Sequence, residues 1–96
     1  MVEVTYLGKL RRLAGVISER ICQTTISEVL NELSGGHSSE FGRLLFVNND
    51  ASLLNGDVEI LVNGRNIKFL NGLATIVNKD DKVTMLYHGA RGFPGG

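Results

Sequence analysis

The sequence contains little cysteine, proline or tryptophan and no excess of charge of either sign. It has one cysteine, one proline and no tryptophan, and its ten basic side chains balance ten acidic ones. A single cysteine, Cys22, cannot form an internal disulfide or a cysteine-based metal cluster, which is typical of a protein in a reducing cytoplasm. The balanced charge argues against nucleic acid as a partner, because proteins that bind a phosphate backbone carry an excess of basic residues.

Long apolar runs are also missing. The segments Ile60–Val62 and Val83–Tyr87 are far too short to span a bilayer, and no charged start followed by an apolar stretch indicates a signal peptide. The two histidines, His37 and His88, have no further ligand at a metal-binding spacing. We therefore expect a cytoplasmic protein that binds neither membranes nor metal ions. With 43% hydrophobic residues, a single domain of this length can bury about two thirds of its unfolded surface.

Alternation of apolar and polar residues predicts strands near both ends of the chain. The predicted strands cover residues 2–7, 16–23, 58–62, 65–69 and 82–87. In the first of them, Val2, Val4 and Tyr6 share one face. The strands on either side of Asn63-Gly64 form a predicted hairpin, because this dipeptide is favoured in two-residue hairpin turns.

One helix is clearly indicated between the second and third predicted strands. Thr25 can cap its first turn, and Glu28 can reach back to the backbone N–H of Thr25, as in a capping box. Four apolar residues then recur with helical spacing and predict a buried stripe: Ile26, Val29, Leu30 and Leu33. Gly35 and Gly36 end this helix. We further expect one helical turn at 9–14 and a second short helix at 41–46.

The order of these elements is strand, strand, helix, hairpin and strand. This order predicts an α+β fold in which one main helix lies across one face of a small mixed sheet. Such an arrangement is the β-grasp, or ubiquitin-like, fold. We expect the folded domain to cover residues 1–88 and a flexible, glycine-rich tail to cover residues 89–96.

The C-terminal residues offer the chemistry that distinguishes this sequence from other small domains. The nine residues after the last predicted strand reach at most about 30 Å, so the terminus can enter a partner's active site while the domain stays outside. Gly95 and Gly96 lack a Cβ and can pass through a narrow channel. The ionised carboxylate of Gly96 can attack the α-phosphate of ATP to give an acyl adenylate. The alternative is a frayed end without function.

Several segments occur in an order that is typical of one family. They are residues 2–6, 9–15, 25–30 and 60–67, the loop and acidic turn at 73–75 and 79–83, and the terminal Gly95-Gly96. In this order they resemble the ubiquitin-like sulfur carriers of the MoaD/ThiS family, above all MoaD, the small subunit of molybdopterin synthase. Residues 36–55 do not align with this pattern. The tail is longer and richer in glycine than that of MoaD, and Arg91 resembles the basic tails of protein modifiers.

The resemblance implies a function for Gly96. A MoeB/ThiF-type enzyme would adenylate Gly96 with ATP and magnesium, and a sulfurtransferase would supply the sulfur of a thiocarboxylate. A MoaE-like large subunit would then use this sulfur in molybdenum cofactor biosynthesis. The chain would bind no cofactor itself and would act as a carrier subunit rather than as an enzyme on its own. The alternatives are a ubiquitin-like modifier that is joined through Gly96 to target lysines, and an interaction module with an inert tail.

Some side chains are candidates for binding these partners. The candidates are Leu61, Leu86, Phe93, Arg11 and Arg91. Leu61 and Leu86 are predicted to point away from the helix and to form an apolar patch of the kind that marks docking sites, although scattered exposed leucines are an equal alternative. Phe93 can anchor the tail in a partner's groove. Arg11 matches a position that resembles a partner contact of MoaD, or it is a solvated loop charge.

Overall fold

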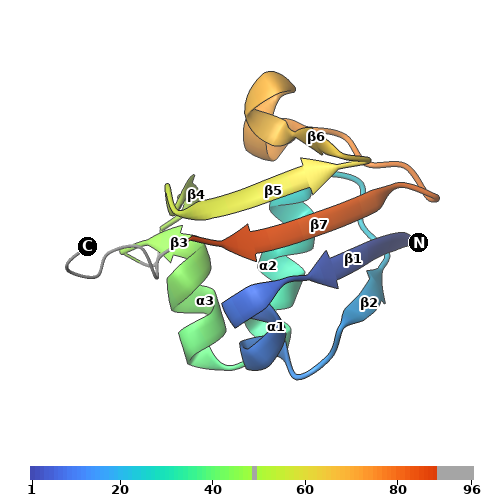
Figure 1. The fold of residues 1–96 in the computed structure, drawn as a ribbon. Helices are drawn as coiled ribbons and strands as arrows, with labels where there is room; N and C mark the ends of the chain where they lie inside the picture. Colours follow the sequence, from blue (N-terminus) through green and yellow to red (C-terminus); the bar gives the residue numbers. More distant parts are fainter. Residues whose placement is uncertain (49, 89–96) are drawn as a thin grey trace.

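The computed structural model describes residues 1–48 and 50–88 and has two layers, a mixed sheet with three α-helices packed on one of its faces (Figure 1). Its strands are β1 (Val2–Tyr6), β2 (Ser18–Ile21), β3 (Phe46–Val47), β4 (Asp50–Leu54), β5 (Val58–Val62), β6 (Arg65–Asn66) and β7 (Lys82–Tyr87). Its α-helices are α1 (Gly8–Ala14), α2 (Ile26–Gly36) and α3 (Ser39–Leu45). Two 3-10 turns, η1 (Ile67–Phe69) and η2 (Gly72–Ala74), precede the last strand.

The last strand of the chain lies at the centre of the main sheet. The strand order is β2-β1-β7-β5-β6, and β3 and β4 form a separate two-stranded sheet. β7 pairs in parallel with β1 and antiparallel with β5, while the β1–β2 and β5–β6 pairs are antiparallel. The predicted α+β class and β-grasp arrangement are therefore confirmed.

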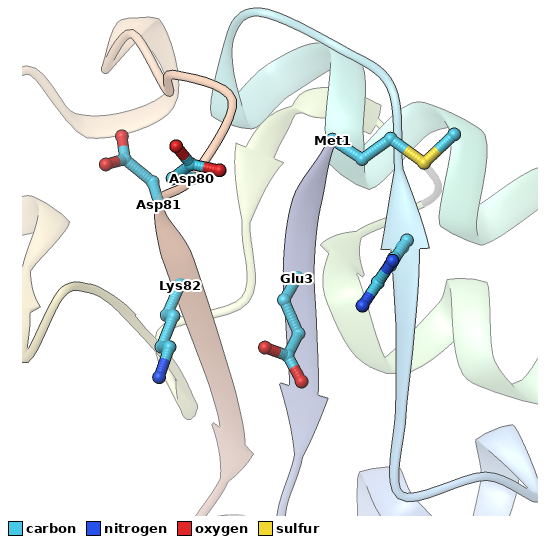
Figure 2. Close-up of a pocket in the computed structure, with 6 residues that line it drawn as sticks. Met1, Glu3, Asp80, Asp81 and Lys82 are labelled. Carbon is cyan, nitrogen blue, oxygen red and sulfur yellow. The ribbon is translucent and has the colours of Figure 1, made fainter.

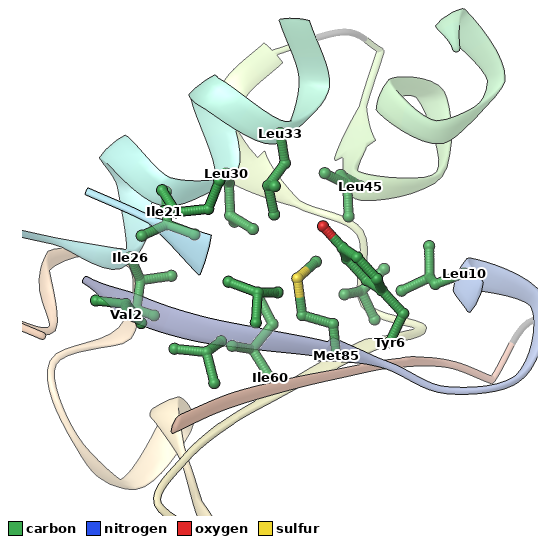
Figure 3. Packing of buried hydrophobic residues seen from close by; sticks show 14 of the residues in the cluster. Val2, Tyr6, Leu10, Ile21, Ile26, Leu30, Leu33, Leu45, Ile60 and Met85 are labelled. Carbon is green, nitrogen blue, oxygen red and sulfur yellow. The ribbon is translucent and has the colours of Figure 1, made fainter. Parts of the chain in front are cut away.

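The hydrophobic core lies between the main sheet and the helices (Figure 3). The three central strands supply alternate residues, namely Val2, Val4, Tyr6, Val58, Ile60, Val62, Val83 and Met85. The helices supply Leu10, Ile26, Val29, Leu30, Leu33, Phe41 and Leu45. All of these side chains are buried, so the predicted inner face of β1 and the predicted apolar stripe of α2 are both confirmed.

The helix α2 begins as predicted, with one addition at its cap. The hydroxyl of Thr25 accepts a hydrogen bond from the backbone N–H of Glu28 at 3.2 Å. The carboxylate of Glu28 accepts in addition from the N–H and the hydroxyl of Thr24, at 3.2 and 2.8 Å. Thr25 also hydrogen-bonds this carboxylate, through its backbone and its side chain, as the capping box predicts, and Thr24 adds two further donors. These bonds lower the pKa of Glu28.

The hairpin turn is confirmed, but the strand after it is shorter than predicted. Asn63 and Gly64 have φ values of 53° and 86°, and a type I′ hairpin turn requires such positive values at both of its central residues. β6 nevertheless ends at Asn66, where residues 65–69 were expected to be extended. The side chain of Asn66 accepts a hydrogen bond from the N–H of Lys68 at 2.9 Å, which starts a 3-10 turn in place of a strand.

Other elements also differ in length from the prediction. β2 covers four residues instead of the expected 16–23, and α1 covers seven residues instead of one turn. α1 ends at Ala14 and is capped by Gly15, whose left-handed conformation (φ 78°) lets its N–H donate to the carbonyl of Arg11 at 3.0 Å. The second short helix is confirmed as α3, which Ser38 caps. The β3–β4 hairpin that follows was not predicted.

Candidate functional site

The candidate site lies where β7 ends. Figure 1 shows β7 between β1 and β5, with its C-terminal end on the side where α1 and α3 lie. The pairing continues for one residue beyond the strand, since the N–H of His88 donates to the carbonyl of Asp57 at 2.7 Å. The predicted site residues Gly95 and Gly96 and the predicted partner contacts Arg91 and Phe93 lie outside the described residues. The structure therefore describes the part of the chain that directly precedes them, up to His88.

A histidine and a glutamate meet at this base. Nε2 of His88 lies 2.9 Å from Oε1 of Glu59 in β5. The other oxygen of Glu59 accepts from Nδ2 of Asn66 at 3.1 Å. The hydrogen bond from His88 is the main cause that lowers the pKa of Glu59, and the charges of His88 and Lys68 contribute. This contact was not predicted from the sequence, because the two residues are 29 positions apart and only the β5–β7 register brings them together.

Leu61 and Leu86 lie beside this contact on the sheet face that the helices leave open. Leu61 is opposite Thr84, and Leu86 is opposite Glu59, so the two leucines are diagonal neighbours across β5 and β7. Both are partly exposed, whereas Ile60, Val62 and Met85 beside them along the strands are buried, and Tyr87 packs against the core. The predicted direction of both side chains is thus confirmed, and their contact with a partner stays a prediction.

The short helix α1 brings basic side chains to the same end of β7. Nζ of Lys9 lies 5.7 Å from the centre of the Tyr87 ring, a cation–π distance. Arg11 is exposed, and its Nε donates to the carbonyl of Tyr6 at 3.2 Å. Arg11 is therefore an exposed cation tied to the end of β1, and its role as a partner contact stays a prediction.

A hollow of about 390 Å³ lies at the other end of β7 and is not suited to chemistry at the terminus (Figure 2). Its lining consists of Met1, Glu3, Arg20, Asp80, Asp81 and Lys82. Figure 2 shows Glu3 and Lys82 on neighbouring strands, where their register places them opposite each other. The carboxylate of Asp81 already accepts from the N–H of Asn78 at 2.7 Å and from Asn63 at 2.9 Å, and these bonds lower its pKa. We interpret Asp80 and Asp81 as parts of the structural turn before β7.

A second polar cluster lies at the edge of the core, between α2 and α3. The hydroxyl of Tyr6 donates to Oε2 of Glu19, and Nε2 of His37 lies 2.6 Å from the same oxygen. The rings of Tyr6, His37 and Phe41 pack against one another, with centroids 4.7–6.0 Å apart. These contacts link β1 and β2 to the α2–α3 connection. The sequence did not predict this cluster. His37 does lie in a loop, as expected, but its contacts with Tyr6 and Glu19 join residues that are far apart in the sequence.

Two further observations concern the described part of the chain only. Within residues 1–48 and 50–88, no three histidine, cysteine, aspartate or glutamate side chains are grouped so that they could hold a metal ion. No helix in these residues is long and apolar enough to cross a membrane. Cys22 is a free and exposed thiol.

The sheet order, the helix across one face and the central last strand define a small ubiquitin-like protein. Residues 4–89 match the ThiS family, and the chain belongs to this family. No curated protein matches the chain.

Three solved structures illustrate the range of similar proteins. The small archaeal modifier protein 1 of Methanosarcina acetivorans is 28% identical, with 90% of each chain covered and a TM-score of 0.82. CysO of Mycobacterium tuberculosis, described as an antigen, is 30% identical, with 91% of this chain and 98% of that chain covered and a TM-score of 0.77. A putative molybdopterin converting factor subunit 1 of Pyrococcus furiosus is 27% identical, with 90% and 94% covered and a TM-score of 0.69.

Proposed function

We propose that the protein is a sulfur carrier whose C-terminal Gly96 is adenylated and then converted into a thiocarboxylate. The observation that carries this proposal is the position of β7. This strand is paired on both sides and leads directly into the segment that ends in Gly95-Gly96. A rigid base followed by a terminus without side chains is what an enzyme needs in order to bind the domain and receive the carboxylate. Membership of the ThiS family supports the same conclusion.

The proposed chemistry proceeds in two steps. A carboxylate oxygen of Gly96 attacks the α-phosphate of ATP, which the activating enzyme binds with magnesium, and pyrophosphate leaves. The terminal sulfur of a persulfide on a sulfurtransferase then attacks the acyl carbon, and AMP leaves. A thiol cleaves the resulting S–S bond, which leaves a thiocarboxylate on Gly96 and a disulfide on the donor side. The carrier contributes an unhindered acyl group and no acid, base, metal or bound cofactor.

The acceptor that we favour is a MoaE-like large subunit, with which the chain would form a molybdopterin synthase in the cytoplasm. The similarity to the putative molybdopterin converting factor subunit of P. furiosus supports this role. The apolar pair Leu61 and Leu86 and the exposed Arg11 offer the surface for the activating enzyme and the large subunit. Phe93 and Arg91 would bind within the partner's channel, together with the terminus.

A second function is favoured by a specific similarity. The archaeal modifier protein of M. acetivorans has the same fold with 28% identity over 90% of both chains. A modifier uses the same first step, because adenylation of Gly96 also precedes its transfer to a lysine amine. The two functions therefore differ in the nucleophile that finally attacks the acyl carbon.

Mass spectrometry of the protein from its native host separates these functions. A Cys22→Ser variant removes the exposed thiol, so that alkylation by iodoacetamide at neutral pH reports a thiocarboxylate. A sulfur carrier will show exchange of one oxygen for sulfur at Gly96 and one alkylation in this variant. Conjugates that release a Gly-Gly remnant on lysine after digestion will indicate the modifier. An unmodified terminus under all growth conditions will contradict both functions.

A further inference from the structure

His88 is the residue at which the described chain ends, and β5 holds it at two points. Its backbone N–H donates to the carbonyl of Asp57 at 2.7 Å, and its Nε2 contacts Glu59 at 2.9 Å. Both partners lie at the start of β5, since Asp57 directly precedes this strand and Glu59 is its second residue. The main chain and the side chain of His88 are therefore fixed to the same neighbour.

The contact between His88 and Glu59 shows which of the two groups donates the hydrogen bond. An ionised carboxylate can only accept hydrogen bonds, so Nε2 must carry a proton whether the imidazole is neutral or charged. Glu59 is itself oriented, because Asn66 of β6 donates to its second oxygen at 3.1 Å. Lys68 of η1 adds a positive charge near the carboxylate. The contact thus has a defined direction, with Nε2 of His88 as the donor and the Glu59 carboxylate as the acceptor.

This contact contributes little to the stability of the domain. The side chains of His88 and Glu59 are 47% and 38% exposed, and exposed pairs of this kind are weak. Its position is more informative, because it lies at the base of the residues that contain the reactive terminus. Each residue that is free to rotate ahead of Gly96 enlarges the volume through which the carboxylate moves, and binding in an active site must then restrict that motion.

We propose that His88 and Glu59 form a clamp that fixes the starting point of residues 89–96 and thereby positions Gly96 for activation. This inference rests on the proposed function. In the proposed clamp, His88 and Glu59 are positioning residues, since neither contacts the reacting atoms. The clamp lies next to Leu86, so an enzyme that docks on the open sheet face meets a terminus whose origin is set relative to that face.

The first test needs no enzyme. The amide order parameter of His88 is measured by 15N relaxation in the full chain, in Glu59→Ala, in His88→Ala and in the double variant. Glu32→Ala, which removes an exposed carboxylate from α2, is the matched control. We expect the order parameter at residue 88 to fall equally in both single variants, with no further fall in the double variant and no change in the control. An unchanged value in Glu59→Ala overturns the clamp.

The second test measures adenylation of the same proteins by a ThiF-type enzyme at neutral pH. We expect the KM for the carrier to rise about 1.5- to fivefold in Glu59→Ala and His88→Ala, the range typical of an exposed pair, with kcat unchanged. A Glu59→His, His88→Glu exchange should restore the KM. Unchanged KM values alongside a loosened residue 88 overturn the positioning role. If the unaltered chain is not adenylated at all, the proposed function fails, while the relaxation experiment still decides whether the clamp exists.

Discussion

Individual residues in this protein combine burial with complete hydrogen bonding. Tyr6 is fully buried, and its hydroxyl donates to Glu19, which His37 also contacts. Among the described residues, no buried side-chain nitrogen or oxygen lacks a hydrogen-bond partner. Burial raises the pKa of Tyr6 far above its usual value, and the hydrogen bond to Glu19 and the charge of Glu19 act in the same direction.

This raised pKa makes a prediction for alkaline unfolding. The folded state keeps the Tyr6 proton at a pH at which the unfolded chain loses it, so the stabilisation is present below about pH 10 and is lost as the pH rises further. Between about pH 10 and 11.5, the unfolding free energy should therefore fall more steeply in the unaltered protein than in Tyr6→Phe, by up to about 1.4 kcal/mol per pH unit. Urea titrations at several pH values measure both slopes, and parallel slopes would contradict the assignment.

Leu86 allows a test of the open sheet face. We expect Leu86→Asp to weaken binding of the activating enzyme at least tenfold, which corresponds to about 1.4 kcal/mol, because it places a charge in the patch next to Glu59. The thermal midpoint should change much less, since Leu86 lies outside the buried core. Leu53→Asp is the control, because Leu53 is an exposed leucine on the separate β3–β4 sheet. Equal losses of binding and stability in Leu86→Asp would show that Leu86 acts as a core residue.

At the level of elements, local sequence patterns predicted the strands and the helix that bury one whole face in the core. β1, β5, β7 and α2 were found because their apolar residues recur with the period of a strand or a helix. β6 was overestimated, since the side chain of Asn66 competes for a backbone N–H. The β3–β4 hairpin was missed because its two strands have no clear alternation and form a ladder of their own.

In the candidate site, too, some features were predicted from local sequence patterns and others were not. The orientation of Leu61 and Leu86 followed from strand alternation alone, and the structure agrees. The contact between Glu59 and His88 depends on which residues of β5 and β7 are opposite each other, and no local pattern contains that register. The pairing of Tyr6 with His37 was likewise hidden, because it depends on how α2 and α3 pack over β1.

The turn between β5 and β6 provides a test at this level. Gly64 has a φ of 86° and no atom within 4 Å of an added Cβ, so Gly64→Ala should cost about 1–2 kcal/mol through backbone strain alone. Gly35 in α2 also has open space around it but no positive φ, so Gly35→Ala should stabilise by about 0.5–1 kcal/mol. Chemical denaturation of both variants measures the difference. The same sign for both would show that backbone conformation does not decide the outcome.

For the whole molecule, the proposed function assigns stability and reactivity to different parts of the chain. The core is built mainly by residues of β1, β5, β7 and the helices, and the proposed reactive group is the carboxylate of Gly96. We expect that deleting Gly96, or adding one alanine after it, leaves the thermal midpoint within about 1 °C and abolishes adenylate formation. Differential scanning calorimetry and ATP–pyrophosphate exchange measure the two effects. Adenylation of the extended chain would contradict the requirement for a terminal glycine carboxylate.

The central place of β7 has a consequence for quality control. A chain that is cut before Lys82 lacks the whole strand that joins β1 to β5, so the two halves of the sheet no longer meet. Such a fragment presents no intact surface to an enzyme that docks on the sheet. Under the proposed function, an enzyme that recognises the folded domain would therefore also check the chain, because it would bind only molecules in which β7 is intact.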